Sequence, residues 1–211
     1  MEKSYKYLGY YLLVLIPLIF AAFYKSYLSK FPDFEVSFDQ SVHVHAFLAS
    51  LWVLMLIVQP FLIVNKKLAW HRVVGKLSYV VFPLLILSFI PGIKKLVDSG
   101  NVIYTFFPVA DLSVLILLYS LGVFYKKKAS KHMRFMIASS LVLLGPTIGR
   151  IMPKFFGFGD IGTQSIQYAI TFFILIGLVM WDRKNKRDYS PYKVALGAFG
   201  IHAMIFYFLY L

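Results

Sequence analysis

The chain has 211 residues, of which 60% are hydrophobic and 15% are charged; its formal net charge is +13 and it has no cysteine. A soluble domain of this length carries far more charge, and the lack of cysteine excludes disulfides, thiolate metal sites and cysteine nucleophiles. The lysines and arginines lie in short turns between apolar runs. They therefore indicate membrane orientation rather than nucleic-acid binding, for which no other feature is present.

Apolar runs of about twenty residues, the length that crosses a bilayer, recur along the whole chain. They predict seven spans, at 7–27, 43–64, 72–93, 103–125, 132–152, 163–181 and 193–211. The connections are short and contain no linker, so we expect one all-α polytopic transmembrane helical bundle, a single domain over residues 1–211. The first run has the basic-then-apolar order of a signal peptide. Because it is long, rich in tyrosine and lacks a small-x-small cleavage site, we interpret it as a retained helix.

Basic residues are distributed unevenly among the turns. Those after the second, fourth and sixth spans contain Lys66, Lys67 and Arg72, then Lys126, Lys127, Lys128, Lys131 and Arg134, then Arg183, Lys184, Lys186, Arg187 and Lys193. The alternate connections have only Lys25, Lys30, Lys94, Lys95 and Lys154 near them. The positive-inside rule therefore predicts a cytoplasmic N-terminus and an external C-terminus, in the cytoplasmic (inner) membrane of the cell.

Polar residues within the spans carry the most information about function, because each is costly in lipid. The predicted orientation sorts them into two layers. The inner layer contains Gln59, His71, Arg72, Lys76, His132 and Arg134. The outer layer contains His45, Asp111, Arg150, Gln164 and Gln167, while His202 falls alone near the middle of the last span.

Each of these groups also has a purely structural interpretation. Arg72 and Arg134 lie at helix ends, where basic side chains reach toward lipid headgroups. Asp111 and Arg150 have similar predicted depths and would suit a structural ion pair as well as a functional site. Gln59 and His202 would suit interhelical hydrogen bonds.

Two stretches resemble an uncharacterised family of predicted bacterial multi-span membrane proteins. The matching residues are His45, Gln59, His71, Arg72 and Gly75 in the first stretch, and His132, Met133, Arg134, Phe135, Met136 and Arg150 in the second. The family commonly has Trp at the position of Phe135, which is a mild departure. The resemblance covers residues 43–93 and 131–152, and it implies a multi-span fold without an established activity.

A more distant similarity links the first stretch to the di-haem cytochrome b group of membrane proteins. That resemblance implies haem b held between two histidines on neighbouring helices. His71 and His132 share the inner layer and would be the axial pair, with Arg72 or Arg134 near the propionates and Gly75 leaving room for the macrocycle. His45 lacks a partner at its own depth, so a complete di-haem set is absent.

Three functions follow as hypotheses, and no motif typical of an enzyme active site is present. The first is a haem-b electron carrier that works with a redox or membrane-complex partner. The second is a transporter, a small-molecule or lipid-binding bundle, or an assembly factor, in which an outer pocket of His45, Asp111, Arg150 and Gln167 binds an anion or relays protons. The third is a zinc-dependent membrane hydrolase similar to the haemolysin and adiponectin-receptor group.

The zinc hypothesis has the weakest support in the sequence. Such a site requires three protein ligands and an activated water. The candidates are His43, His45, Asp111 and His202. The paired histidines that this group has on its last span are missing, since His202 stands alone.

Overall fold

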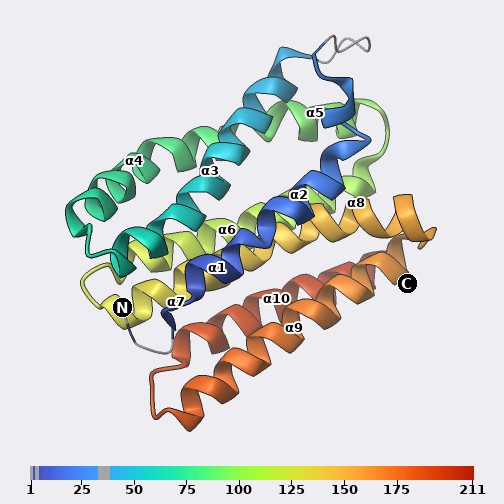
Figure 1. Ribbon diagram of the computed structural model, residues 1–211. Coiled ribbons are helices and arrows are strands. Elements are labelled where there is room, and N and C mark those ends of the chain that lie inside the picture. Colours follow the sequence, from blue (N-terminus) through green and yellow to red (C-terminus); the bar gives the residue numbers. More distant parts are fainter. Residues whose placement is uncertain (1, 3–4, 33–38) are drawn as a thin grey trace. The chain divides into compact units, whose positions relative to one another are not determined.

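The computed structural model describes residues 2, 5–32 and 39–211, and the regular structure of these residues is entirely helical (Figure 1). The helices fall into two compact units, Met1–Thr105 and Phe106–Leu211, and each unit is described by itself. The all-α prediction is confirmed, whereas the single domain over residues 1–211 stays a prediction.

Unit 1 is organised around a helical hairpin. Its helices are α1 (Leu8–Leu13), α2 (Leu15–Tyr24), η2 (Leu28–Lys30), α3 (Gln40–Val64), α4 (Leu68–Leu87), α5 (Ile90–Asp98) and η3 (Val102–Thr105). The Asp39 carboxylate caps α3 by accepting a hydrogen bond of 3.1 Å from the backbone N–H of Ser41. The long helices α3 and α4 then pack against each other across a short turn. Gly9 lets α1 approach α3, because a Cβ at this position would lie 2.8 Å from the ring of Phe61.

Unit 2 contains most of the buried polar side chains. Its elements are α6 (Phe106–Phe124), α7 (Ala129–Ser140), η4 (Leu141–Leu143), α8 (Leu144–Phe156), α9 (Asp160–Lys184) and α10 (Ser190–Tyr210). The three consecutive elements α7, η4 and α8 run on as one helical stretch. Helix α9 packs against α8 and α10, and α10 also contacts α6 and α7. Leu118, Leu175 and Phe199 form part of the fully buried interior.

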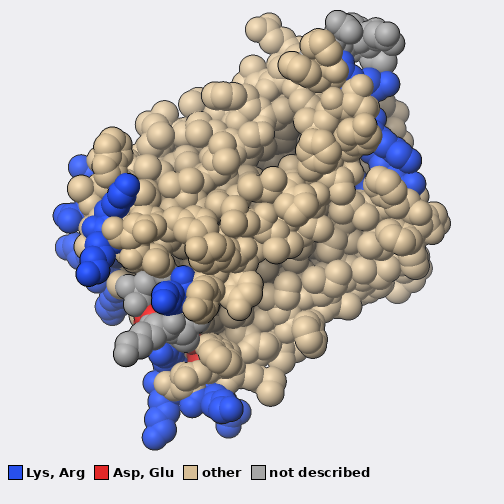
Figure 2. Space-filling model, viewed as in Figure 1, with Lys and Arg blue, Asp and Glu red and all other residues tan. Residues whose placement is uncertain are grey.

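Within the described ranges, six helices are long and apolar enough to cross a membrane. They are Gln40–Val64, Leu68–Asp98, Val102–Phe124, Ala129–Phe156, Asp160–Lys184 and Ser190–Tyr210. These correspond to the last six predicted spans, so a multi-pass membrane protein is supported by both length and composition. The first predicted span corresponds to a shorter apolar stretch, Leu8–Tyr24, which is divided between α1 and α2. Figure 2 shows Lys and Arg gathered at the ends of helices, with uncharged residues covering the visible helix sides.

Helices α3 and α9 end in the same way, with an asparagine followed by a lysine in the left-handed backbone region. The Asn65 side chain donates a hydrogen bond of 2.8 Å to the carbonyl of Phe61, and Asn185 donates one of 2.7 Å to Trp181. The next residues, Lys66 and Lys186, have φ of 58° and 52°. A Cβ makes this conformation unfavourable, and glycine is the residue that adopts it most readily.

Replacing Lys66 with glycine should therefore stabilise the protein. We expect the free energy of unfolding to rise by about 1 kcal/mol, because the left-handed conformation costs a non-glycine residue roughly 1–2 kcal/mol. Unfolding in mixed micelles measures the change. The matched control is Lys67→Gly, which removes the same charge at a residue with φ of −83° and should not stabilise. Equal effects of the two substitutions would contradict the assigned turn.

Candidate functional site

Three helices of unit 2 are joined by titratable side chains. The Tyr168 hydroxyl on α9 lies 2.7 Å from Nδ1 of His202 on α10. On the other side of the ring, His202 Nε2 lies 3.3 Å from Oδ1 of Asp111 on α6, an ion-pair distance without the alignment of a hydrogen bond. Tyr168 and His202 are each only 3% exposed. An acid, an imidazole and a phenol are thus connected in line inside the bundle.

Two glutamines and an arginine extend this chain. Buried Gln164 makes hydrogen bonds with Tyr168 and with the side chain of Gln167, both on its own helix α9. Arg150 on α8 interacts electrostatically with Asp111, and its guanidinium donates a hydrogen bond of 2.9 Å to the carbonyl of Pro146. We call the connected residues Asp111, Arg150, Gln164, Gln167, Tyr168 and His202 the polar network. The network joins α6, α8, α9 and α10.

Local geometry explains why these side chains meet. Each helical residue turns the axis by about 100°, so Gln164, Gln167 and Tyr168 point to one side of α9. Gly145 on α8 makes room for the acid, because a Cβ there would lie 2.6 Å from Asp111 Oδ2. The contact between α8 and α6 at this point therefore needs a residue without a side chain.

Gly145→Ala should disturb the network without removing any of its polar groups. The added methyl would push the Asp111 carboxylate away from His202, and we expect the free energy of unfolding to fall by about 1–3 kcal/mol, as in other overpacked interiors. Thermal unfolding in detergent measures this loss. Gly149→Ala is the matched control, because a Cβ there meets no atom within 4 Å. A stable Gly145→Ala protein would show that the carboxylate does not lie against this helix.

The predicted outer pocket is brought together in part. Asp111, Arg150 and Gln167 belong to the polar network. His45 lies in unit 1, where its Nδ1 is 2.9 Å from the hydroxyl of Ser88. The interhelical hydrogen bond expected of His202 is found, with the hydroxyl of Tyr168. The structure adds a contact between His202 and Asp111, so His202 is not alone at its depth.

The predicted inner residues lie in both units. In unit 1, Gln59 donates a hydrogen bond of 3.3 Å to the carbonyl of His71, and its amide lies 3.6 Å from a Cβ placed on Gly75. The side chain of Arg72 is exposed and donates to the carbonyl of Leu68 on its own helix. In unit 2, Nδ1 of His132 lies 2.8 Å from the carbonyl oxygen of Gly122. Because His71 and His132 belong to different units, their pairing stays a prediction.

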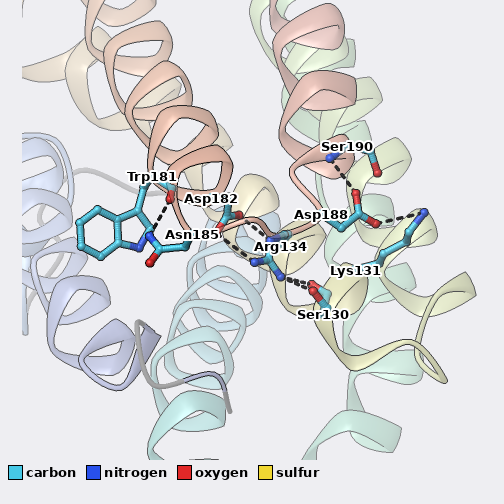
Figure 3. Close-up of polar contacts among 8 residues, drawn as sticks. All are labelled: Ser130, Lys131, Arg134, Trp181, Asp182, Asn185, Asp188 and Ser190. Atoms are coloured by element: carbon cyan, nitrogen blue, oxygen red, sulfur yellow. Dashed lines mark hydrogen bonds and ion pairs between the residues drawn. The ribbon is translucent and has the colours of Figure 1, made fainter.

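Arg134 forms a buried ion pair at the basic end of unit 2 (Figure 3). Its Nε lies 2.6 Å from Asp182 Oδ2 and its Nη2 lies 3.0 Å from Oδ1, and both residues are fully buried. The remaining nitrogen, Nη1, donates to the carbonyl and the hydroxyl of Ser130. Nearby, Lys131 and Asp188 form a partly exposed pair at 3.4 Å. These contacts place the turn before α7 and the turn after α9 at the same end of the unit.

Asp182 and Tyr168 are the residues that reasoning from the sequence missed, together with the contact between His202 and Asp111. Asp182 follows Gln164 by eighteen residues, which is five full helical turns, so helical spacing alone could have placed both on one face. It was overlooked because it stands beside the basic residues Arg183 and Lys184. An acid among so many bases indicates a specific partner.

No protein family, curated protein or solved structure matches the chain. Its function is therefore inferred from the geometry of the site. Across residues 2, 5–32 and 39–211, no group of three or more His, Asp or Glu side chains gathers so that it could hold a metal ion. Of the four zinc candidates, His43 and His45 belong to unit 1 and Asp111 and His202 to unit 2, so their convergence stays a prediction. His43 lies 2.7 Å from the hydroxyl of Tyr27.

Proposed function

We propose that this multi-pass membrane protein transfers protons through the polar network of unit 2, as part of a transport function. The observation that carries the proposal is the unbroken contact from Asp111 through His202 to Tyr168. Ionisable residues within membrane spans are costly and mark functional sites by default. Here three of them are connected across three different helices, which a structural ion pair alone does not require.

The chemistry suits proton transfer because imidazole has two nitrogens. One nitrogen of His202 faces the phenol and the other faces the carboxylate, so the ring can accept a proton on one side and release one on the other. Arg150 interacts electrostatically with the Asp111 carboxylate, and Gln164 makes a hydrogen bond with the Tyr168 phenol. The surrounding low dielectric strengthens each of these interactions.

The proposal includes the topology of the chain: seven crossings, a cytoplasmic N-terminus, an external C-terminus and a place in the cytoplasmic membrane. The charge distribution supports it, because both strongly basic turns of unit 2 lie at the end marked by the Arg134–Asp182 pair. Tyr168 is fourteen residues from Asp182, or about 21 Å along α9, so the network lies toward the other end. In this orientation the network is closer to the outer surface.

Single-cysteine labelling can test the topology cleanly, because the chain has no cysteine of its own. We expect Lys154→Cys to react with a membrane-impermeant maleimide on intact cells and Lys127→Cys to react only after lysis. The reverse result would contradict the proposed orientation. The same reagent on a cysteine placed at Glu2 reports whether Leu8–Tyr24 crosses the membrane, since this stretch would then separate Glu2 from α3.

Proton transfer is tested directly in vesicles. The purified protein is incorporated into liposomes that contain a pH-sensitive dye, and a potassium gradient with valinomycin sets the membrane potential. We expect a change of internal pH faster than in protein-free liposomes. A rate equal to that of protein-free liposomes, with and without an imposed pH gradient, would overturn the proposal.

A second candidate, haem-b electron transfer with a redox partner, is favoured by one observation. The bond between His132 Nδ1 and the carbonyl of Gly122 resembles the second contact that orients many axial histidines. The other residues fit less well: the amide of Gln59 occupies the space beside Gly75, and the donors of Arg134 face Asp182 and Ser130. Haem bound at this site would supply one-electron chemistry.

An absorption spectrum separates the two candidates. Haem binding predicts a Soret band in protein purified from cells with ample haem, and its loss in His71→Ala or His132→Ala. A colourless protein would rule the second candidate out. A haem protein that moves no protons would instead rule out the first.

A further inference from the structure

Two buried polar atoms, one within the network and one beside it, have no hydrogen-bond partner. They are Nε2 of Gln167, which is 1% exposed, and the hydroxyl of Thr171, which is 0% exposed. A buried polar group without a partner costs free energy, so such atoms are rare unless water or an ion completes them. Two of them one helical turn apart, on the same side of α9, mark a common site.

The hydroxyl of Thr171 lacks the hydrogen bond that a helical threonine commonly makes. A helical threonine commonly donates its hydroxyl to the carbonyl three or four residues earlier. Thr147 on α8, which is 1% exposed, does this with the carbonyls of Leu143 and Leu144 at 2.8 and 3.1 Å. The Thr171 hydroxyl makes no such bond, which leaves it available to a ligand in the interior of unit 2.

We infer that Gln167 and Thr171 bind internal water, which extends the polar network by one turn along α9; this inference deepens the proposed proton transfer. Water both donates and accepts hydrogen bonds, so it satisfies the amide N–H of Gln167 and the hydroxyl of Thr171 together. A cation is disfavoured because the amide nitrogen only donates. An anion is disfavoured because the carboxylate of Asp111 belongs to the same network.

The position of the water gives it a role in the path. Leu175, one turn beyond Thr171 on the same side of α9, is fully buried and apolar. The water site is therefore the end of the network that faces the Arg134–Asp182 pair. Tyr168 and this water lie on the same side of Leu175 along α9, so Leu175 separates both from the basic end of the helix.

Thr171→Val tests the inference, because valine has nearly the same shape and no hydroxyl. Infrared difference spectra of the protein in lipid nanodiscs, in ordinary and in ¹⁸O-labelled water, report on water held in the interior. We expect an isotope-sensitive water band in the wild-type protein, its loss in Thr171→Val, and its retention in the control Thr147→Val. A band of equal intensity in all three proteins, or no band in the wild type, would overturn the inference.

Thermal unfolding gives an independent reading of the same site. If water is bound, Thr171→Val breaks its hydrogen bonds and lowers the midpoint, whereas removal of a hydroxyl with no ligand raises it. Thr171→Ser keeps the hydroxyl and should retain the water band. It therefore controls for effects of changing the side chain that do not depend on the hydroxyl. A raised midpoint in Thr171→Val would contradict bound water.

The two proposals fail in different ways. If the water band is lost in Thr171→Val but the wild-type protein shows no proton flux, the water site is supported and the proton-transfer function is contradicted. Proton flux that depends on Asp111, together with a water band that Thr171→Val does not change, would support proton transfer and contradict the water site.

Discussion

Asp182→Ala will lower the free energy of unfolding by about 3–5 kcal/mol, the range found when one partner of a buried ion pair is removed. The Arg134 guanidinium is fully buried and places two nitrogens on the Asp182 carboxylate. Without the acid, a positive charge is left inside the protein beside the neutral carbonyl and hydroxyl of Ser130. Reversible unfolding in mixed micelles measures the loss at neutral pH.

Asp188→Ala is the matched control for this prediction. It removes the exposed partner of Lys131 at the same end of unit 2, and exposed pairs contribute about 1 kcal/mol or less. The hydrogen bonds from Ser190, together with the charge of Lys131, lower the pKa of Asp188. A lowered folded-state pKa stabilises the fold above the unfolded value of about 3.9, and this contribution is lost as pH falls. At neutral pH this contribution of Asp188 is fully present, so the stability losses of Asp182→Ala and Asp188→Ala can be compared directly.

A double substitution distinguishes the cost of leaving one buried charge without its partner from the cost of losing the whole ion pair. Arg134→Met with Asp182→Leu replaces both charges by apolar side chains of similar size. Such replacements are often neutral or stabilising, so we expect the double variant to be more stable than Asp182→Ala. If Asp182→Ala costs no more than Asp188→Ala, the ion pair is not buried as described.

Asp111→Asn will reduce proton flux into liposomes by roughly 100-fold, the lower range for loss of a positioned acid or base. The amide has almost the same shape as the carboxylate but cannot take up or release the proton. His202 would keep its contact with Tyr168, so the fold should survive the change. The flux is measured with the dye assay, normalised to the protein incorporated.

Two further variants test whether the loss of flux in Asp111→Asn is specific to the polar network. Tyr168→Phe removes the phenol at the other end of the relay and should also lower the flux, because the His202 nitrogen then loses its partner. Thr147→Val, whose hydroxyl is bonded within its own helix, should transfer protons at the wild-type rate. Flux retained in Asp111→Asn would show that protons take another route.

Length and hydropathy by themselves determined the coarse architecture of this protein. Six apolar runs reappear as helices long enough to cross a bilayer, because this property depends only on neighbouring residues. The run at 7–27 was harder to judge, since Leu8–Tyr24 is shorter and divided between α1 and α2. The sequence also indicated that Asp111, Arg150 and Gln167 lie at similar depths, and these three belong to one network.

Only the tertiary structure decided which side chains are partners. Tyr168 and His202 are 34 residues apart, and Arg134 and Asp182 are 48 apart. Helical spacing predicts the side of a helix on which a residue lies, but not the neighbouring helix that this side meets. That choice depends on packing among several helices at once, down to the space that Gly145 leaves for Asp111. The sequence alone thus determined helices long and apolar enough to cross a membrane, with costly polar residues among them, and the packing of unit 2 joined several of these residues into one network.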